Sequence, residues 1–178
     1  MDVFSHGLWS GAIYKAINRR AKNPLNIRLS VLFGVFPDIF SFIPLFSWMF
    51  LKLILGEFNF SDFPKIEEVE PAQRDTFFIF TLTNILYSLS HSLAMFLIIF
   101  CLAYLIFKRP IWEMGAWLFH ILIDIPTHTY QFYPTPFLWP FSDIKLSGFS
   151  WATPWFLILN YSAIIFIYFC LYYFKNKE

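Results

Sequence analysis

Three side chains that can bind a cation or carry a proton lie within one apolar stretch. His120, Asp124 and His128 follow one another at intervals of four residues. Each such step turns a helical side chain by only about 40°, so all three face one side of a helix. Imidazole and carboxylate are ligands for Zn²⁺ and similar divalent ions, and such an ion with an open coordination position activates water for hydrolysis.

The surrounding composition is that of a membrane protein. Of the 178 residues, 58% are hydrophobic, with 25 Phe and 7 Trp, which is more apolar than an ordinary soluble domain. Residues 1–178 are therefore predicted to form one all-α domain, a polytopic helical membrane protein whose partners are membrane lipids. The net charge of +1 argues against nucleic acid as a partner, because no basic stripe is dense enough to follow phosphates.

About four to five membrane-embedded helices are expected. Residues 92–107, with a more polar lead-in from 76, and residues 111–128 and 151–174 are long enough to cross a bilayer or nearly so. Before them come two shorter helix candidates, a Pro-containing apolar stretch and an acidic loop, at residues 5–18, 27–36, 40–55 and 57–75 respectively.

Basic residues predict the orientation. They gather in three segments, which are Lys15 to Arg28, Lys108 with Arg109, and Lys175 with Lys177. Loops rich in Lys and Arg stay in the cytoplasm. Two topologies satisfy this rule. In one, the N-terminus is cytoplasmic and residues 31–55 cross once. In the other, the chain starts outside, enters with residues 5–18 and returns with residues 27–36.

The second topology is preferred because it brings polar groups to one depth. At 1.5 Å per residue it places them roughly 15 to 27 Å above the cytoplasmic turns. The first topology separates Asp38 from Asp124, and buried charges need partners. In the preferred topology the first two helices are too short to span about 30 Å, so the polar layer lies in the outer leaflet and opens to the non-cytoplasmic side.

All four histidines and two carboxylates belong to this layer. The predicted metal ligands are His6, Asp38, His91, His120 and Asp124, and the predicted catalytic groups are Asp38, Asp124 and His128. Other roles remain open for three of them. Asp38 follows Pro37 and can cap a turn, His6 can cap a helix or face lipid headgroups, and His128 can lie at the rim and titrate freely.

In these residues the chain resembles the membrane-bound metal-dependent hydrolases, the YdjM-type, LexA-regulated inner-membrane family. Five landmarks carry the resemblance in order along most of the chain: Ser5-His6-Gly7, Gly34-Val-Phe-Pro37-Asp38, Ser90-His91-Ser92, His120-x-x-x-Asp124-x-x-Thr127 and Pro140-Phe141-Ser142. The family is in turn similar to the zinc-dependent phospholipase C and P1 nuclease group. The resemblance implies a hydrolase of the bacterial-type cytoplasmic membrane, and its distant part implies a phosphoester substrate.

Two departures from the family pattern remove possible ligands. Phe40 stands where members often carry a second Asp, and Leu86-Tyr87-Ser88 replaces a His-Arg-Gly. One or two divalent ions, Zn²⁺ first, are therefore expected, with a lipid or phosphoester substrate. Two other functions stay open. Intramembrane His and Asp also mark transport and proton-relay proteins, and a metal site can serve only to stabilise a scaffold.

Overall fold

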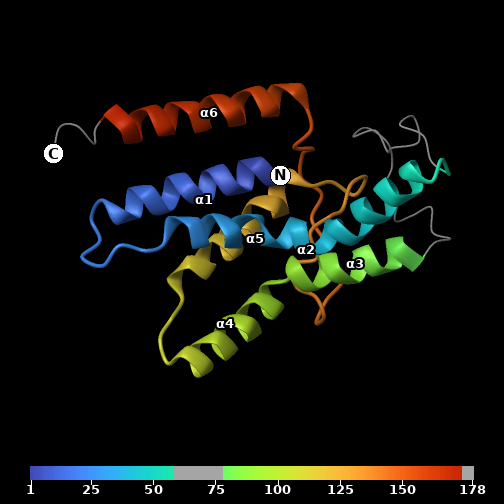
Figure 1. Ribbon diagram of the computed structural model, residues 1–178, viewed down its shortest axis with the longest axis horizontal. Coiled ribbons are helices and arrows are strands. Elements are labelled where there is room, and N and C mark those ends of the chain that lie inside the picture. The colour runs from blue at the N-terminus through green and yellow to red at the C-terminus, as the bar shows by residue number, and fades with distance from the viewer. Residues whose placement is uncertain (58–77, 174–178) are drawn as a thin grey trace.

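The computed structural model describes residues 1–57 and 78–173, and the regular elements in these ranges are all helices (Figure 1). This confirms the all-α prediction. The predicted acidic loop over residues 57–75 lies, apart from Glu57, outside the described residues. In chain order the elements are α1 (Val3–Asn18), α2 (Ile27–Ile54), α3 (Phe78–Ser90), α4 (Leu93–Phe107), the short 3₁₀ helix η3 (Trp112–Met114), α5 (Gly115–Thr127) and α6 (Pro154–Tyr173).

Helix α2 is the centre of the fold. It packs against α1, α3 and α5, while α6 packs on the other side of α1 (Figure 1). Its first turn is capped by Asn26, whose side chain accepts a hydrogen bond from the Leu29 amide. The helices that carry His6, His120 and Asp124 therefore both pack directly against α2.

The prediction that residues 27–36 and 40–55 form separate segments is wrong, because α2 runs through both Pro37 and Pro44. Each proline removes one backbone hydrogen bond, a loss that membrane helices tolerate. Ser41 Oγ donates to the Pro37 carbonyl at 2.7 Å and adds a bond beside the first proline. Asp38 consequently lies inside a helix and caps no turn.

The predicted segment over residues 92–107, together with its lead-in from residue 76, forms a bent pair of helices. Helices α3 and α4 meet at an angle of 63°, with His91 and Ser92 in the break. Ser92 caps α4 by accepting from the Met95 amide, and its hydroxyl donates to the Trp139 carbonyl. The start of α4 agrees with the predicted segment at residue 92, whereas the bend itself was not predicted.

Within residues 1–57 and 78–173, helices α2 and α6 are long and apolar enough to cross a membrane, and α3 with α4 makes a third candidate if the bent pair is one span. Helix α1 has 16 residues and α5 has 13, so each falls short of the roughly 20 needed to span. Membrane association follows from these spans. The count of four to five embedded helices stays a prediction.

The chain between α5 and α6 folds back over the end of α5. The Gly148, Phe149 and Trp151 amides donate to the His128, Pro126 and Thr127 carbonyls at 2.8, 3.0 and 3.0 Å. These bonds satisfy carbonyls that a helix end leaves without partners. A Cβ on Gly148 would stand 1.9 Å from the Pro126 carbonyl oxygen, so only glycine fits this approach.

Candidate metal centre

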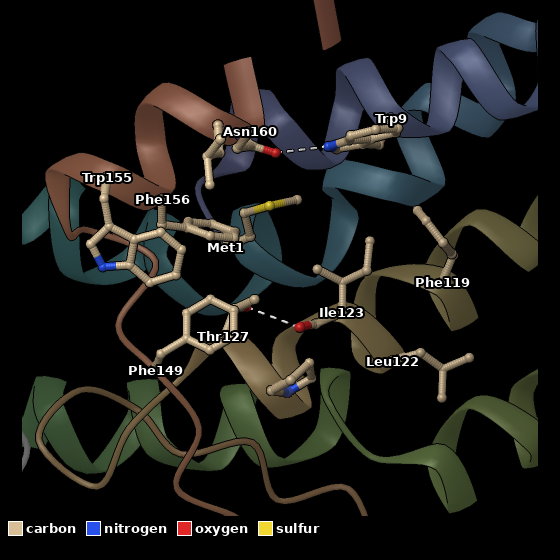
Figure 2. Close-up of a pocket in the computed structure, with 12 residues that line it drawn as sticks. Met1, Trp9, Phe119, Leu122, Ile123, Thr127, Phe149, Trp155, Phe156 and Asn160 are labelled. Carbon is tan, nitrogen blue, oxygen red and sulfur yellow. Dashed lines mark hydrogen bonds between the residues drawn. The ribbon is translucent and has the colours of Figure 1, made fainter. Parts of the chain in front are cut away.

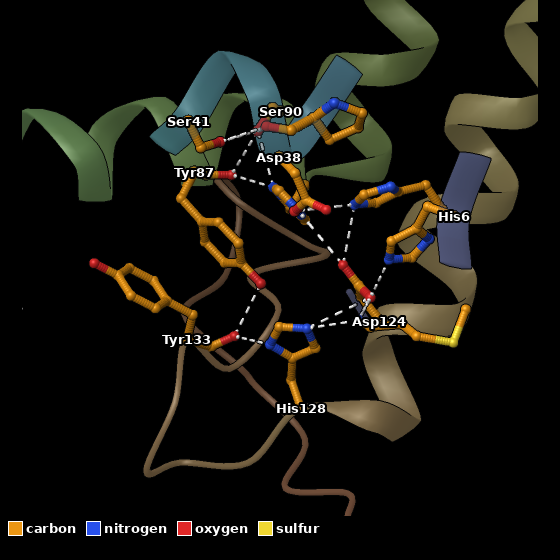
Figure 3. Close-up of polar contacts among 12 residues, drawn as sticks. His6, Asp38, Ser41, Tyr87, Ser90, Asp124, His128 and Tyr133 are labelled. Carbon is orange, nitrogen blue, oxygen red and sulfur yellow. Dashed lines mark hydrogen bonds and ion pairs between the residues drawn. The ribbon is translucent and has the colours of Figure 1, made fainter. Parts of the chain in front are cut away.

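Six ionisable side chains meet inside the helix bundle (Figure 3). All are buried, with at most 6% of each residue exposed. They come from different elements: His6 from α1, Asp38 from α2, His91 from the α3–α4 break, His120 and Asp124 from α5, and His128 from the residue after α5. We refer to these six as the His/Asp cluster.

Four members form a compact inner group, the central four, which are Asp38, His91, His120 and Asp124. Each offers one ligand atom, and these atoms all lie within 4.8 Å of one another. Asp38 Oδ1 is 3.6 Å from Nε2 of both histidines. Asp124 Oδ2 is 3.5 Å from His91 Nε2 and 3.1 Å from His120 Nε2. Two imidazoles and two carboxylates are a ligand set that suits Zn²⁺.

The backbone of α2 determines how His120 presents its ring. Its Nδ1 donates to the Gly34 carbonyl at 2.7 Å. Because a carbonyl oxygen can only accept, Nδ1 carries the proton, and Nε2 of the neutral ring keeps its lone pair. A second hydrogen bond of this kind fixes ring orientation in histidines that bind metals. His120 Nε2 therefore points into the central four as an acceptor.

A chain of hydroxyl groups holds His91 in the same way. His91 Nδ1 lies 2.8 Å from Ser90 Oγ, and Ser90 Oγ lies 2.8 Å from Ser41 Oγ. Since Ser41 donates to the Pro37 carbonyl, Ser90 donates to Ser41 and can accept from His91. The Tyr87 carbonyl, 3.2 Å from Nδ1, is a second acceptor for the same proton. His91 Nε2 is thus also an acceptor.

With both imidazoles neutral and protonated on Nδ1, the central four consequently turns only acceptors towards one point. The two Nε2 atoms are 3.1 Å apart with no proton to share, and Asp124 Oδ2 and the other oxygen of Asp38, Oδ2, have no hydrogen-bond partner within the described ranges. Lone pairs and carboxylates packed together without a donor are costly when buried. A cation resolves this conflict, so the residues present fit a divalent metal ion.

The other oxygen of Asp124 faces a second set of groups. Asp124 Oδ1 is 3.0 Å from His6 Nε2 and 3.5 Å from His128 Nε2. The Met1 amino group also contacts this oxygen and lies 2.9 Å from His128 Nε2. A positive group therefore stands beside the central four on this side. Asp124 is the residue that joins the two halves of the His/Asp cluster.

His128 and His6 flank the central four. The alternative that His128 lies at the rim is wrong, because its side chain is only 5% exposed and its Nδ1 donates to the Tyr133 carbonyl at 2.9 Å. Its Nε2 lone pair faces Asp124. His6 stacks on His120 with ring centroids 3.6 Å apart, and its Nδ1 has no partner among the described residues. His6 lies inside α1 and caps no helix, whereas His128 is the C-cap residue of α5, and its amide donates to the Asp124 carbonyl at 3.1 Å. Both residues are buried.

Several supporting groups could not be identified from the sequence. Tyr87 stacks on His91 with centroids 3.8 Å apart and donates to the Tyr133 carbonyl at 2.9 Å. The Gly34 and Tyr133 carbonyls orient His120 and His128. Main-chain acceptors leave no trace in residue type. Ser90 stood next to His91, but its contact with Ser41 depends on the packing of α2 against α3.

We compared the chain with protein-family models, curated proteins and solved structures, and none of them matches it.

Proposed function

We propose that the protein is an integral membrane hydrolase that holds one or two divalent cations, Zn²⁺ first, in the His/Asp cluster. The observation that carries the proposal is the convergence of two Nε2 lone pairs and two carboxylates, within 4.8 Å, without a donor among them. Asp38, His91, His120 and Asp124 would hold the ion, with His6 next to them. The resemblance noted in the sequence supports the same class.

A divalent ion at the central four would lower the pKa of a water molecule and neutralise charge on a phosphoryl or acyl oxygen. The chain's own residues would do the rest. Asp124 Oδ1 and His128 Nε2, 3.5 Å apart, lie where a proton from water can be accepted. As the water oxygen bonds to phosphorus or carbon and the ester bond breaks, His128 would return that proton to the leaving oxygen.

A lipid or phosphoester substrate fits the surroundings of the cluster. The six residues are buried among helices of a chain with two to three candidate membrane spans, so a substrate reaches them most directly from the bilayer. The basic segments around Arg19 and Lys108 support a cytoplasmic location for the opposite end of the bundle. We therefore propose a bacterial-type cytoplasmic membrane with the cluster towards the non-cytoplasmic side.

A proton relay is the alternative function, and it requires polar groups that continue through the bundle. An apolar core between the His/Asp cluster and the basic turn at Lys108 counts against such a continuous path. Phe96, Met114, Trp117 and Ile121 make up this core, and each is at most 4% exposed.

Metal content and turnover of three purified proteins test the proposal. Wild type, Asp124→Asn and the matched control Asp143→Asn, in a loop outside the cluster, would be analysed for bound metal by elemental analysis. Each would then be incubated with vesicles of phosphatidylglycerol and phosphatidylethanolamine. Wild type and control are expected to contain one or two Zn²⁺ and to release lipid products, and Asp124→Asn to lose both.

Wild-type protein without bound metal after purification in zinc-supplemented buffer would contradict the proposal. Proton flux into proteoliposomes that depends on Asp124 and needs no metal would instead support the relay. Bound metal whose chelation lowers the melting temperature, with no turnover of phosphoesters or lipid esters, would indicate a structural metal site.

A further inference from the structure

An apolar cavity of about 520 Å³ lies beside the His/Asp cluster, between α1, α5 and α6 (Figure 2). Its size is that of a pocket for a small ligand, for which roughly 300 to 1,000 Å³ is typical. Aromatic rings dominate its lining, from Trp9 on α1, Phe119 on α5, Phe156 on α6 and Phe149 in the preceding loop. The cavity is separate from the central four, which it does not include.

The Asn160 amide, the Thr127 hydroxyl and the Trp9 indole N–H on the cavity wall are already bonded within the protein. Asn160 Oδ1 accepts from Trp9 Nε1 at 2.9 Å, and its Nδ2 donates to Ser5 Oγ at 2.7 Å. Thr127 Oγ1 donates to the Ile123 carbonyl at 2.9 Å. A polar ligand would therefore have to displace existing bonds to be recognised here. The cavity selects for hydrocarbon.

One end of the cavity reaches the residues that contact Asp124. Ile123 and Thr127, which flank Asp124 on α5, form part of the wall. Met1 forms another part, and its amino group contacts Asp124 and His128. A chain in the cavity would thus end within one residue of the cluster. A negatively charged or ester headgroup at this end would meet the Met1 amino group, which is complementary to it in charge.

The other end faces the membrane. Leu122, Trp155 and Leu159 line the cavity and are 48%, 52% and 61% exposed. Leu159 and Trp155 belong to α6, which among the described helices is one of two that are long and apolar enough to cross a bilayer. Surface of this kind on a membrane-spanning helix contacts lipid tails. The opening therefore connects the cavity to the hydrocarbon of the bilayer.

We infer that the cavity holds one acyl chain of a membrane glycerophospholipid, whose phosphate or ester group lies at the Met1 end of the cavity, next to the His/Asp cluster. This inference rests on the proposed function, because it assigns the substrate of that site. It commits to a lipid with its chain entering from the bilayer between α5 and α6. A soluble phosphoester would leave the cavity unused.

The test is a binding measurement on the whole protein, with phosphatidylglycerol as the probe. Delipidated protein in detergent would be titrated and analysed by native mass spectrometry. Leu122→Trp and Leu159→Trp fill the cavity, while Ile158→Trp, on a 67% exposed neighbour outside its lining, is the matched control. Wild type and control should bind one lipid, and each filled variant about tenfold more weakly, since excluding two methylenes costs that much.

Unchanged lipid affinity in the filled variants would overturn the inference. Metal content of the same samples reports whether the variants fold around an intact centre. If they lose metal, wild type crosslinked to phosphatidylglycerol with a diazirine at the chain end decides: adducts at Phe119 or Phe156 support the cavity, and adducts only on α4 overturn it. Turnover with unchanged KM in the filled variants would reject the cavity but keep the hydrolase. Lipid binding in the cavity without turnover would support the cavity and reject the hydrolase.

Discussion

Ser90 determines which nitrogen of His91 faces the central four. Its hydroxyl oxygen lies 2.8 Å from His91 Nδ1, and its O–H donates to Ser41 Oγ. Ser90 Oγ can therefore only accept from His91, so the imidazole proton stays on Nδ1. Without Ser90 the Tyr87 carbonyl would remain as the acceptor, at the longer distance of 3.2 Å. The ring would then be free to rotate or to move its proton to Nε2, where it would block a ligand atom.

Ser90→Ala is therefore expected to weaken metal binding by about tenfold, the lower end of the range for losing such an orienting partner. Competition with a chromophoric zinc chelator would measure the affinity. Ser88→Ala, the same change on the same helix, is the matched control and should bind as wild type does. Equal affinities in the two variants would show that Ser90 does not orient His91.

At this scale the sequence identified the ionisable members of the cluster and missed what orients them. His120 and Asp124 follow from helical spacing alone. His6, Asp38 and His91 required an assumption about depth in the membrane. The orienting partners of His120 and His128 are carbonyls of Gly34 and Tyr133, which every residue type possesses. Only packing decides which carbonyl is near.

Gly34 allows helices α1 and α2 to approach closely enough to bring His6 to Asp124. A Cβ at this position would stand 2.1 Å from Ser10 Oγ and 2.8 Å from Ser10 Cβ. Small residues at a crossing allow helix backbones to come together in membrane proteins. Because the Gly34 carbonyl also accepts from His120, the same position connects three helices of the site.

Gly34→Ala should push α1 away from α2, destabilise the protein by about 1 to 3 kcal/mol and lower its metal content. Thermal unfolding in detergent and elemental analysis would measure both effects. The double variant Gly34→Ala with Ser10→Gly removes the clashing atoms and should recover most of the metal. If Gly34→Ala keeps wild-type metal content, the close crossing is not needed to assemble the cluster.

Helix boundaries were predictable where apolar runs end at caps or charges. The predicted segments at residues 5–18 and 151–174 correspond to α1 and α6 within a few residues. The prediction failed at α2. Its two prolines suggested a break, but the helix continues through both, and it packs against α1, α3 and α5. It also missed the bend at His91, because continuous hydrophobicity does not reveal a change of direction.

The basic residues of the described turns lie at the end of the helix bundle away from the His/Asp cluster. The turn between α1 and α2, the turn between α4 and η3, and the last turn of α6 lie towards the same end of the bundle (Figure 1). The first two carry Arg19, Arg20, Lys22, Lys108 and Arg109. Helix α2 starts at this basic end and leads through Asp38 to the other. The helical arrangement thus agrees with a single orientation in the membrane, in which both basic turns face the cytoplasm.

This orientation predicts which residues a reagent outside the cell can reach. In a variant with Cys101 and Cys170 replaced by Ala, single cysteines would be placed at Lys22 and Arg109 in the basic turns and at Asp143 in the loop before α6. A membrane-impermeant maleimide applied to spheroplasts should label Asp143→Cys, because its loop covers the site end of α5. Lys22→Cys and Arg109→Cys should react only after permeabilisation, since basic loops stay in the cytoplasm. The opposite labelling pattern would place the His/Asp cluster towards the cytoplasm and require a cytoplasmic source of substrate.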